Sequence, residues 1–270
     1  MNLANRVAVI TGAGSGIGRG IALAIARRGG KLALCDVREA GLAETAALVA
    51  ALGAPCTTHR LDVADRAAVA GFPAEVLAAH GAVHLLFNNA GVAVGGTFER
   101  VSEQDFDWLM EINFHAVVRL TRAFLPHLRS ADRAWIVNLS SIYGIVAPPG
   151  QTAYCASKFA VRGFSNALRH ELQSTNVGLT VVHPGGVATG IVRHARLPAG
   201  TDAAEAAQRI RHSERLLRMP PETAGEIIVK AVEREHARVL VGADARLLAL
   251  LERLMPVRYW AVMGALVGRS

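Results

Sequence analysis

Cysteine and long apolar runs are both scarce in this chain of 270 residues. The three cysteines, Cys35, Cys56 and Cys155, form an odd number with no close pair, which argues against a disulfide framework and a zinc site. No uninterrupted apolar run reaches the roughly 18 residues that a membrane-spanning helix needs. No charged-then-apolar leader precedes the first β-rich stretch, at residues 6–10. We therefore expect a soluble, cytoplasmic protein without a metal site.

Lysine is also rare, because Lys31, Lys158 and Lys230 are the only lysines and arginine supplies most of the net charge of +7. Such a balance is compatible with nucleic-acid binding, but the arginines are scattered and not interleaved with aromatic residues. The charge therefore indicates a solvated basic surface. An apolar fraction of 51% against 19% charged residues is typical of a globular protein.

Short apolar stretches that favour strands alternate with helical stretches along the chain. The expected strands are residues 6–10, 31–35, 55–60, 83–87, 134–139, 177–183 and 238–241. This rhythm predicts a parallel sheet with helices on both faces. No repeat and no low-complexity linker interrupts it, so we expect one domain over residues 1–270. Ligands of such sheets bind at the carboxyl ends of the strands.

A glycine-rich stretch at residues 11–18 joins the first strand to the first helix. Gly12, Gly16 and Gly18 follow a Gly-x-x-x-Gly-x-Gly spacing, and the pattern Gly-x-Gly-x-x-Gly cannot be placed on them. Glycines allow a backbone to approach a pyrophosphate closely, and a helix start offers free N–H groups. Strand, glycine loop and helix together favour a dinucleotide site. The alternative is a βα turn without a ligand.

Asp36 lies at the end of the second expected strand, 18 residues after Gly18. A carboxylate at this place accepts hydrogen bonds from both ribose hydroxyls and repels a 2′-phosphate, which favours NAD over NADP. Arg38 could offset part of that repulsion, so NADP stays possible. Ser15 occupies the glycine loop where a basic residue would favour NADP.

Tyr154 and Lys158 are four residues apart on an expected helix that follows Gly150. Residues at this spacing share one helix face, and an ammonium group beside a phenol lowers the pKa of the phenol. The spacing also occurs on ordinary amphipathic helices. Asn113 lies inside another expected helix, at residues 102–129. Because asparagine is a poor interior helix residue, Asn113 either faces solvent or marks a local break.

Six elements in this order resemble the classical short-chain dehydrogenase/reductase (SDR) family over about residues 6–241. They are the glycine loop, residues 88–91, Ser141, Tyr154, Lys158 and the turn at Pro184 and Gly185. The resemblance implies an α/β fold with a Rossmann-type doubly wound sheet of seven parallel strands and helices on both faces. It also implies a nicotinamide cofactor, action on a CH–OH group, and assembly into homodimers or homotetramers.

The resemblance carries the family's catalytic pattern onto four positions without a departure. Tyr154 corresponds to the catalytic acid/base, and Lys158 to the residue that binds the nicotinamide ribose and lowers the pKa of Tyr154. Ser141, 13 residues before Tyr154, corresponds to the hydrogen-bond donor to the substrate oxygen. Asn113 corresponds to the asparagine whose helix break holds a water in a proton relay.

The resemblance also implies the cofactor contacts. These are Gly12, Ser15, Gly16, Ile17 and Gly18 in the loop, Asp36, Asp62 and Val63 on the adenosine side, Asn89, Ala90 and Gly91 beside the ribose, Tyr154 and Lys158, and Pro184, Gly185, Val187 and Thr189 near the carboxamide.

The expected substrate walls are apolar, which suits a hydrophobic secondary alcohol or ketone. They are Val92, Val94, Ile142, Ile145, Val146 and Ile191. A substrate flap is expected at about residues 190–220. Its part at residues 193–218 holds six arginines against three acidic residues. These arginines either bind an anionic group of the substrate or form the solvated face of an amphipathic flap. His194 and His212 are expected at the surface.

Residues 243–270 are expected to form an amphipathic helical tail. Leu247, Leu248, Leu250, Leu251 and Leu254 share one helix face. Pro256 can begin a second helix, whose apolar residues are Tyr259, Trp260, Val262, Met263, Leu266 and Val267. Three uses compete. The tail closes a neighbour's active site, packs in a dimer, or lies on a membrane surface with Arg253, Arg258 and Arg269 toward lipid headgroups. Packing on protein is favoured.

Together these features predict an NAD-dependent oxidoreductase that transfers a hydride between the cofactor and a hydrophobic secondary alcohol or ketone. Two alternatives stay open: an NADP-dependent ketoreductase of the same family, and a regulator that binds NAD(H) without catalysis. The intact catalytic pattern argues against the regulator.

Overall fold

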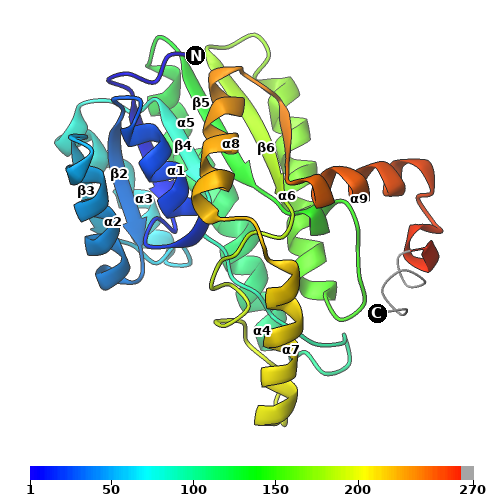
Figure 1. The fold of residues 1–270 in the computed structure, drawn as a ribbon. Coiled ribbons are helices and arrows are strands. Elements are labelled where there is room, and N and C mark those ends of the chain that lie inside the picture. Colours follow the sequence, from blue (N-terminus) through cyan, green and yellow to red (C-terminus); the bar gives the residue numbers. More distant parts are fainter. Residues whose placement is uncertain (263–270) are drawn as a thin grey trace.

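The computed structural model describes residues 1–262, and a seven-stranded parallel sheet runs through its centre (Figure 1). The strands are β1 (Val7–Thr11), β2 (Lys31–Asp36), β3 (Cys56–Arg60), β4 (Leu85–Asn88), β5 (Ala134–Leu139), β6 (Val177–Pro184) and β7 (Arg238–Val241). Their spatial order is β3-β2-β1-β4-β5-β6-β7, and every pair is parallel. The predicted Rossmann-type sheet is confirmed.

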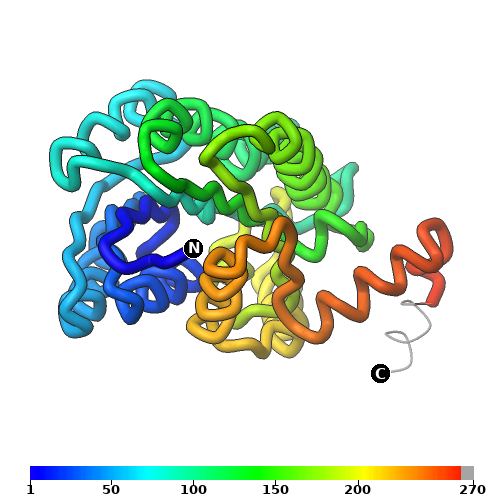
Figure 2. The backbone as a smooth tube through the Cα atoms, turned by 90° about the horizontal axis from the view of Figure 1, so that it is seen from above, coloured from blue at the N-terminus to red at the C-terminus, as the bar shows by residue number. Residues whose placement is uncertain are grey.

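Six helices pack in two layers, one on each face of the sheet (Figure 2). The helices of the described residues are α1 (Gly16–Ala26), α2 (Glu39–Ala51), α3 (Arg66–His80), α4 (Glu103–Met110), α5 (Ala116–Arg129), α6 (Thr152–Glu171), α7 (Ala203–Leu216), α8 (Pro221–Glu233) and α9 (Ala243–Leu254). One layer contains α1, α2 and α8, and the other α3, α5 and α6. The central strands are buried on both faces, which explains their unbroken apolar runs.

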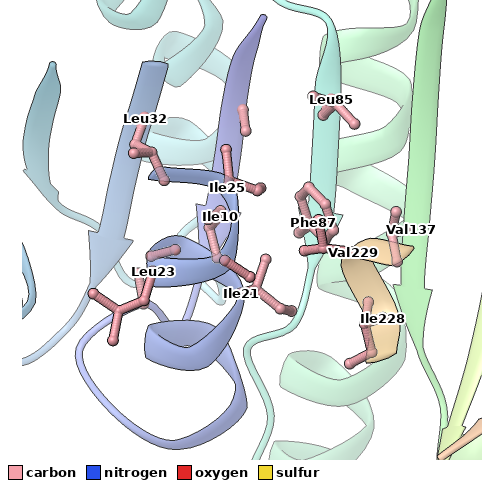
Figure 3. Packing of buried hydrophobic residues seen from close by; sticks show 14 of the residues in the cluster. Ile10, Ile21, Leu23, Ile25, Leu32, Leu85, Phe87, Val137, Ile228 and Val229 are labelled. Atoms are coloured by element: carbon pink, nitrogen blue, oxygen red, sulfur yellow. The ribbon is translucent and has the colours of Figure 1, made fainter. Parts of the chain in front are cut away.

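The layer around α1 and α8 shows why the central strands need large apolar side chains. In Figure 3, Ile21 and Ile228 from these two helices lie against Ile10 and Phe87 of the sheet. All four belong to one buried cluster. Burial of such side chains stabilises a fold by about 1.5–3 kcal/mol each, so this layer holds the central strands, and with them the loops at their ends.

The helix expected over residues 102–129 is interrupted. Ser102 caps α4 by accepting a hydrogen bond from the backbone N–H of Asp105, at 3.1 Å. A π-helical turn at Glu111–His115 then separates α4 from α5. Asn113 lies inside this turn and is fully buried. Of the two expectations for Asn113, the local break is therefore right and the solvent-facing position is wrong.

The tail begins as expected with a helix, α9, which extends away from the body in both views (Figures 1 and 2). A short helical stretch follows at residues 259–262. Met263, Leu266, Val267 and Arg269 of the expected second helix lie outside the described residues. Within residues 1–262, no helix combines the length and the apolar character that crossing a bilayer requires.

Helices α1 and α8 touch backbone to backbone, and two glycines permit this. A Cβ atom on Gly225 would overlap the backbone of Gly20, and one on Gly20 would overlap the carbonyl of Pro221. We predict that Gly225→Ala lowers the free energy of unfolding by about 1–3 kcal/mol, because the helices must separate. Urea denaturation measures this change.

The matched control is Gly71→Ala in the interior of α3, where a Cβ atom would have no neighbour within 4 Å. This variant should gain about 0.5–1 kcal/mol from helix propensity. Similar free energies of unfolding for the two variants would contradict the close approach of α1 and α8.

Candidate active site

The residues predicted for a cofactor and a catalytic centre gather at the carboxyl edge of the sheet. The glycine loop follows β1, Asp36 ends β2, residues 89–91 follow β4, Ser141 follows β5 and residues 185–189 follow β6. Since all these strands are parallel, the segments after them meet at one edge.

The glycine loop folds directly against the segment after β4. Gly12 has φ +65°, and a Cβ atom on it would lie 2.9 Å from Ala90 Cα. The Asn89 side-chain N–H group donates hydrogen bonds to the carbonyls of Thr11 at 2.8 Å and Gly12 at 3.2 Å. A Cβ atom on Gly18 would overlap the Gly12 carbonyl. The loop therefore needs glycine at these two positions.

Asp36 holds the other side of the loop. Its carboxylate accepts hydrogen bonds from the backbone N–H groups of Gly14 and Arg38, each at 3.0 Å. The Arg38 guanidinium donates to Ser15 Oγ at 2.7 Å and lies 3.8 Å from the Asp36 carboxylate. Arg38 thus spans the space between the two residues on which the cofactor prediction depends.

The remaining residues predicted to bind the cofactor differ in their contacts and exposure. Gly16 contacts the far side of the site, since a Cβ atom on it would lie 3.1 Å from Thr189 Cγ2. Ile17 is partly buried and packs against the core. Asp62 is exposed and accepts a hydrogen bond from the Ala64 N–H at 2.9 Å, whereas Val63 is buried.

Backbone hydrogen bonds hold the segment after β6, residues 185–189, at both ends. Pro184 ends β6, and the Gly185 N–H donates to the Val241 carbonyl at 2.9 Å. Val187 pairs with Met219 in an isolated bridge, and the Thr189 N–H donates to the Val187 carbonyl at 2.8 Å. This turn brings Thr189 to the glycine loop.

Lys158 and Asn113 meet beside Gly91. A Cβ atom on Gly91 would lie 3.3 Å from Asn113 Oδ1 and 3.5 Å from Lys158 Nζ. Lys158 is buried, and its ammonium donates to the Leu139 carbonyl at 3.0 Å. The same ammonium lies 5.6 Å from the centre of the Tyr154 ring. The structure thus places three of the four expected catalytic residues around one point.

Asn113 is held tightly in its π-helical turn. Its Oδ1 atom accepts from the Val92 N–H at 2.8 Å, and its Nδ2 atom donates to the Val92 carbonyl at 3.0 Å and to Ser157 Oγ at 3.2 Å. Ser140 Oγ donates to the Lys158 carbonyl at 2.8 Å. Ser140 therefore supports the helix, while Ser141 Oγ accepts a hydrogen bond from the Tyr143 N–H at 3.1 Å and acts to lower the pKa of Tyr154.

The pKa values of the pair run against one sequence-based expectation. Burial raises the pKa of Tyr154 to about 12, and the hydrogen bond with Ser141 lowers it only in part. Burial also lowers the pKa of Lys158 to about 8. A low-dielectric environment disfavours both the phenolate and the ammonium. In this environment the pKa of Tyr154 stays above its usual value, whereas the sequence predicts a lower one.

His183 is a residue that sequence reasoning missed. It is fully buried at the end of β6, and its Nδ1 atom lies 2.9 Å from the Ser141 carbonyl oxygen. Because a carbonyl only accepts, Nδ1 carries the proton, and Nε2 has no hydrogen-bond partner among the described residues. Burial lowers the pKa of His183 to about 4, so the ring is neutral at pH 7. His183 thus fixes the backbone of Ser141.

The tail also reaches the site, through contacts that no local sequence signal indicated. Asp244 in the first turn of α9 accepts a hydrogen bond from the Gly186 N–H at 2.6 Å. Tyr259 accepts one from the Ala147 N–H at 2.8 Å through its hydroxyl oxygen. The tail therefore packs against the loops after β5 and β6 of its own chain.

Three of the expected substrate walls are covered by this tail. Ile142, Ile145 and Val146 are buried in one cluster with Ala245 and Ala249 of α9. They support the loop after Ser141 from behind. Val94 is also buried, in a cluster that Val92 and Tyr154 flank, whereas Val92 and Ile191 are partly exposed.

Three of the six arginines of residues 193–218 form ion pairs with described residues. Arg196 lies 2.9 Å from the Asp105 carboxylate and 3.6 Å from the centre of the Trp108 ring. Arg193 pairs with Glu214 at 2.6 Å, and Arg209 pairs with Glu205 at 2.8 Å. These contacts favour a role in holding the segment over a role in binding a substrate anion. His194 and His212 are exposed, as expected.

Residues 6–199 match the short chain dehydrogenase family. The chain belongs to the short-chain dehydrogenase/reductase family. A Mycobacterium tuberculosis protein described as the oxidoreductase SadH is 44% identical over 266 residues, which are 98% of this chain and 96% of that protein. This SDR chain is therefore similar to that protein over nearly its whole length, and the predicted resemblance is confirmed.

Two solved SDR structures carry different cofactors. One, from Burkholderia phymatum in complex with NAD, is 33% identical with a TM-score of 0.87 and 94% of each chain covered. The other, a metagenomic oxidoreductase in complex with NADP, is 28% identical with a TM-score of 0.73, covering 89% of this chain and 98% of that one. A nicotinamide cofactor is therefore supported.

The neutral state of His183 predicts a pH dependence of stability. In the unfolded chain histidine binds a proton below about pH 6.5, whereas the folded protein resists protonation of His183 until about pH 4. The unfolded state thus binds more protons. As the pH is lowered through this interval, the free energy of unfolding therefore decreases by up to about 1.4 kcal/mol per pH unit. The charges of Arg162 and Arg238 act in the same direction.

The variant His183→Asn keeps a donor for the Ser141 carbonyl and removes the titrating ring. Its unfolding free energy, measured with urea at a series of pH values, should therefore fall less steeply between pH 6.5 and 4 than that of the wild type. The exposed His212→Asn is the control and should retain the wild-type slope. A wild-type slope in His183→Asn would contradict the assignment.

Proposed function

We propose that this SDR protein is an NAD-dependent oxidoreductase that transfers a hydride between NAD and a hydrophobic secondary alcohol or ketone. One observation carries the proposal. Lys158 and Asn113 converge beside Gly91, and the Lys158 ammonium lies 5.6 Å from the centre of the Tyr154 ring, next to a loop that needs glycine at positions 12 and 18. A regulator that merely binds NAD(H) would not need this cluster of buried polar groups.

The residues present fit a dinucleotide. Ser15 precedes α1, but its side chain does not cap the helix, so the first N–H groups of α1 stay available to a pyrophosphate. Gly14 and Gly16, on either side of Ser15, have no side chain to cover the backbone. We assign Asp36 to accept hydrogen bonds from the adenosine ribose, and Thr189, whose side chain lies near Gly16, to bind the carboxamide.

The chemistry of the site follows from its buried polar groups. Tyr154 takes the hydroxyl proton during alcohol oxidation and returns it during ketone reduction, while Ser141 holds the substrate oxygen. Asn113 and Lys158 lie where a proton relay to solvent would begin. When bound, the nicotinamide would accept or supply the hydride, and its oxidised ring would bring a positive charge to the site.

The energetic demand on this site is large. Moving the pKa of Tyr154 from about 12 to near 7 needs about 7 kcal/mol of phenolate stabilisation. Lys158 supplies part of this as an ammonium, and a second positive charge close by supplies more. A bound oxidised nicotinamide would supply such a charge.

Asp36 favours NAD because its carboxylate repels a 2′-phosphate. Arg38 lies 3.8 Å from that carboxylate and so offsets part of the repulsion, which keeps an NADP-dependent ketoreductase as the second candidate. We further assign residues 190–220 as a substrate flap within one SDR domain of residues 1–270. A homodimer or homotetramer in the cytoplasm is the assembly that we propose.

The test of catalysis is Tyr154→Phe. Turnover of a panel of secondary alcohols and ketones, followed through cofactor absorbance, should fall by a factor of about 10² to 10⁴, because the proton has no acceptor. NADH binding, measured by fluorescence titration, should persist. Tyr143→Phe is the control, since the Tyr143 ring lies edge-on to Tyr154 at 6.1 Å and its hydroxyl makes no hydrogen bond with another described residue. Normal turnover by Tyr154→Phe would refute the mechanism.

The test of cofactor choice uses two variants with opposite effects. Asp36→Ala should raise the ratio of kcat/KM for NADP to that for NAD by about tenfold or more, because it removes the charge that repels the 2′-phosphate. Arg38→Gln should lower this ratio. If Asp36→Ala leaves the ratio unchanged, the ribose is not bound at Asp36.

A further inference from the structure

Helix α9 presents an apolar stripe that the rest of the described chain does not cover. Leu247, Leu250 and Leu254 are 66%, 54% and 69% exposed, and Val257 just after the helix is 89% exposed. The opposite face of α9 is the one that packs on the body, through the buried Ala245 and Ala249. Stability of the fold therefore does not explain why the outer face is leucine.

Charged residues around the stripe are sorted by sign. Arg246, Arg253 and Arg258 are exposed, and none of them forms an ion pair with another residue in the range 1–262. The two acidic residues of α9 act toward the body. Asp244 accepts a hydrogen bond from the Gly186 N–H, and Glu252 raises the pKa of Arg238 of β7, which Arg253 lowers. The outer side of α9 is therefore apolar and positive, without a negative charge.

This pattern selects among the surfaces that could cover the stripe. A second copy packed by two-fold symmetry would bring the same face of both helices together. Arg246 and Arg253 of the two copies would then share one interface with no carboxylate to offset them. An anionic lipid surface offers what the stripe lacks, because it accepts leucine side chains at the depth of the acyl chains and arginine at the headgroups.

The position of α9 suits a flat partner. The helix leads away from the body in two perpendicular views, so its outer face is not recessed (Figures 1 and 2). The net charge of +7 draws the whole protein toward a negative surface.

We propose that the outer face of α9, defined by Leu247, Leu250, Leu254 and Val257 with Arg246, Arg253 and Arg258, docks on the surface of an anionic bilayer. The helix lies in the plane of the interface and does not cross it. This reverses the preference for protein packing that the sequence alone suggested, and it does not depend on the proposed reaction.

The experiment is flotation of the full-length protein with vesicles of phosphatidylcholine, with and without phosphatidylglycerol. The wild type should float with the vesicles that contain phosphatidylglycerol, and added salt should reduce this binding. Leu250→Gln/Leu254→Gln and Arg246→Gln/Arg253→Gln should each lower the partition coefficient by about tenfold or more, because one removes apolar insertion and the other the attraction to headgroups.

Two control variants make the same chemical changes elsewhere. Leu48→Gln/Leu52→Gln replaces two leucines that are also exposed, and Arg60→Gln/Arg66→Gln removes the same positive charge. Both should float like the wild type, and thermal unfolding verifies that every variant is folded. Flotation of the α9 variants at the wild-type level overturns the proposal. So does loss of an oligomer in the leucine variant during sedimentation velocity without any change in flotation, because the stripe would then face a second copy.

Discussion

The burial of one positive charge, the ammonium of Lys158, organises this structure. Removing an ammonium from water is costly unless fixed acceptors surround it, and the sheet provides one in the Leu139 carbonyl at the end of β5. Tyr154 on the same helix, Asn113 in its π-helical turn and Gly91 after β4 close around it. Each comes from a different element, so the two-layer core that aligns the strands is also what assembles the site.

The fold was largely predictable because its signals are local. Strands such as β1 and β5 are buried at every position and mostly apolar, since both faces of the sheet are covered. The glycine loop lies within one loop, and Tyr154 and Lys158 lie about one helical turn apart. Residues this close in the sequence are also close in space. Asn113 revealed its break for the same reason, because its side chain competes for the backbone of its own helix.

What the sequence could not show depends on contacts between distant segments or on burial. The bond from His183 to the Ser141 carbonyl spans 42 residues, and the bond from the Ala147 N–H to Tyr259 spans 112. Ile142 and Ile145 look like pocket walls until α9 is seen to cover them. The direction in which the pKa of Tyr154 shifts could not be predicted from Lys158 alone, because desolvation of the phenol is the largest influence and raises the pKa.

The amide of Asn89 has a consequence for the energetics of ligand capture. It ties the carbonyls of Thr11 and Gly12 to the segment after β4 by bonds within the protein itself. A flexible glycine loop would lose backbone conformational entropy each time it bound a dinucleotide. Here that entropy is already lost when the chain folds, so more of the contact energy remains as affinity. The glycines supply the close approach, and the asparagine supplies the rigidity that glycine by itself removes.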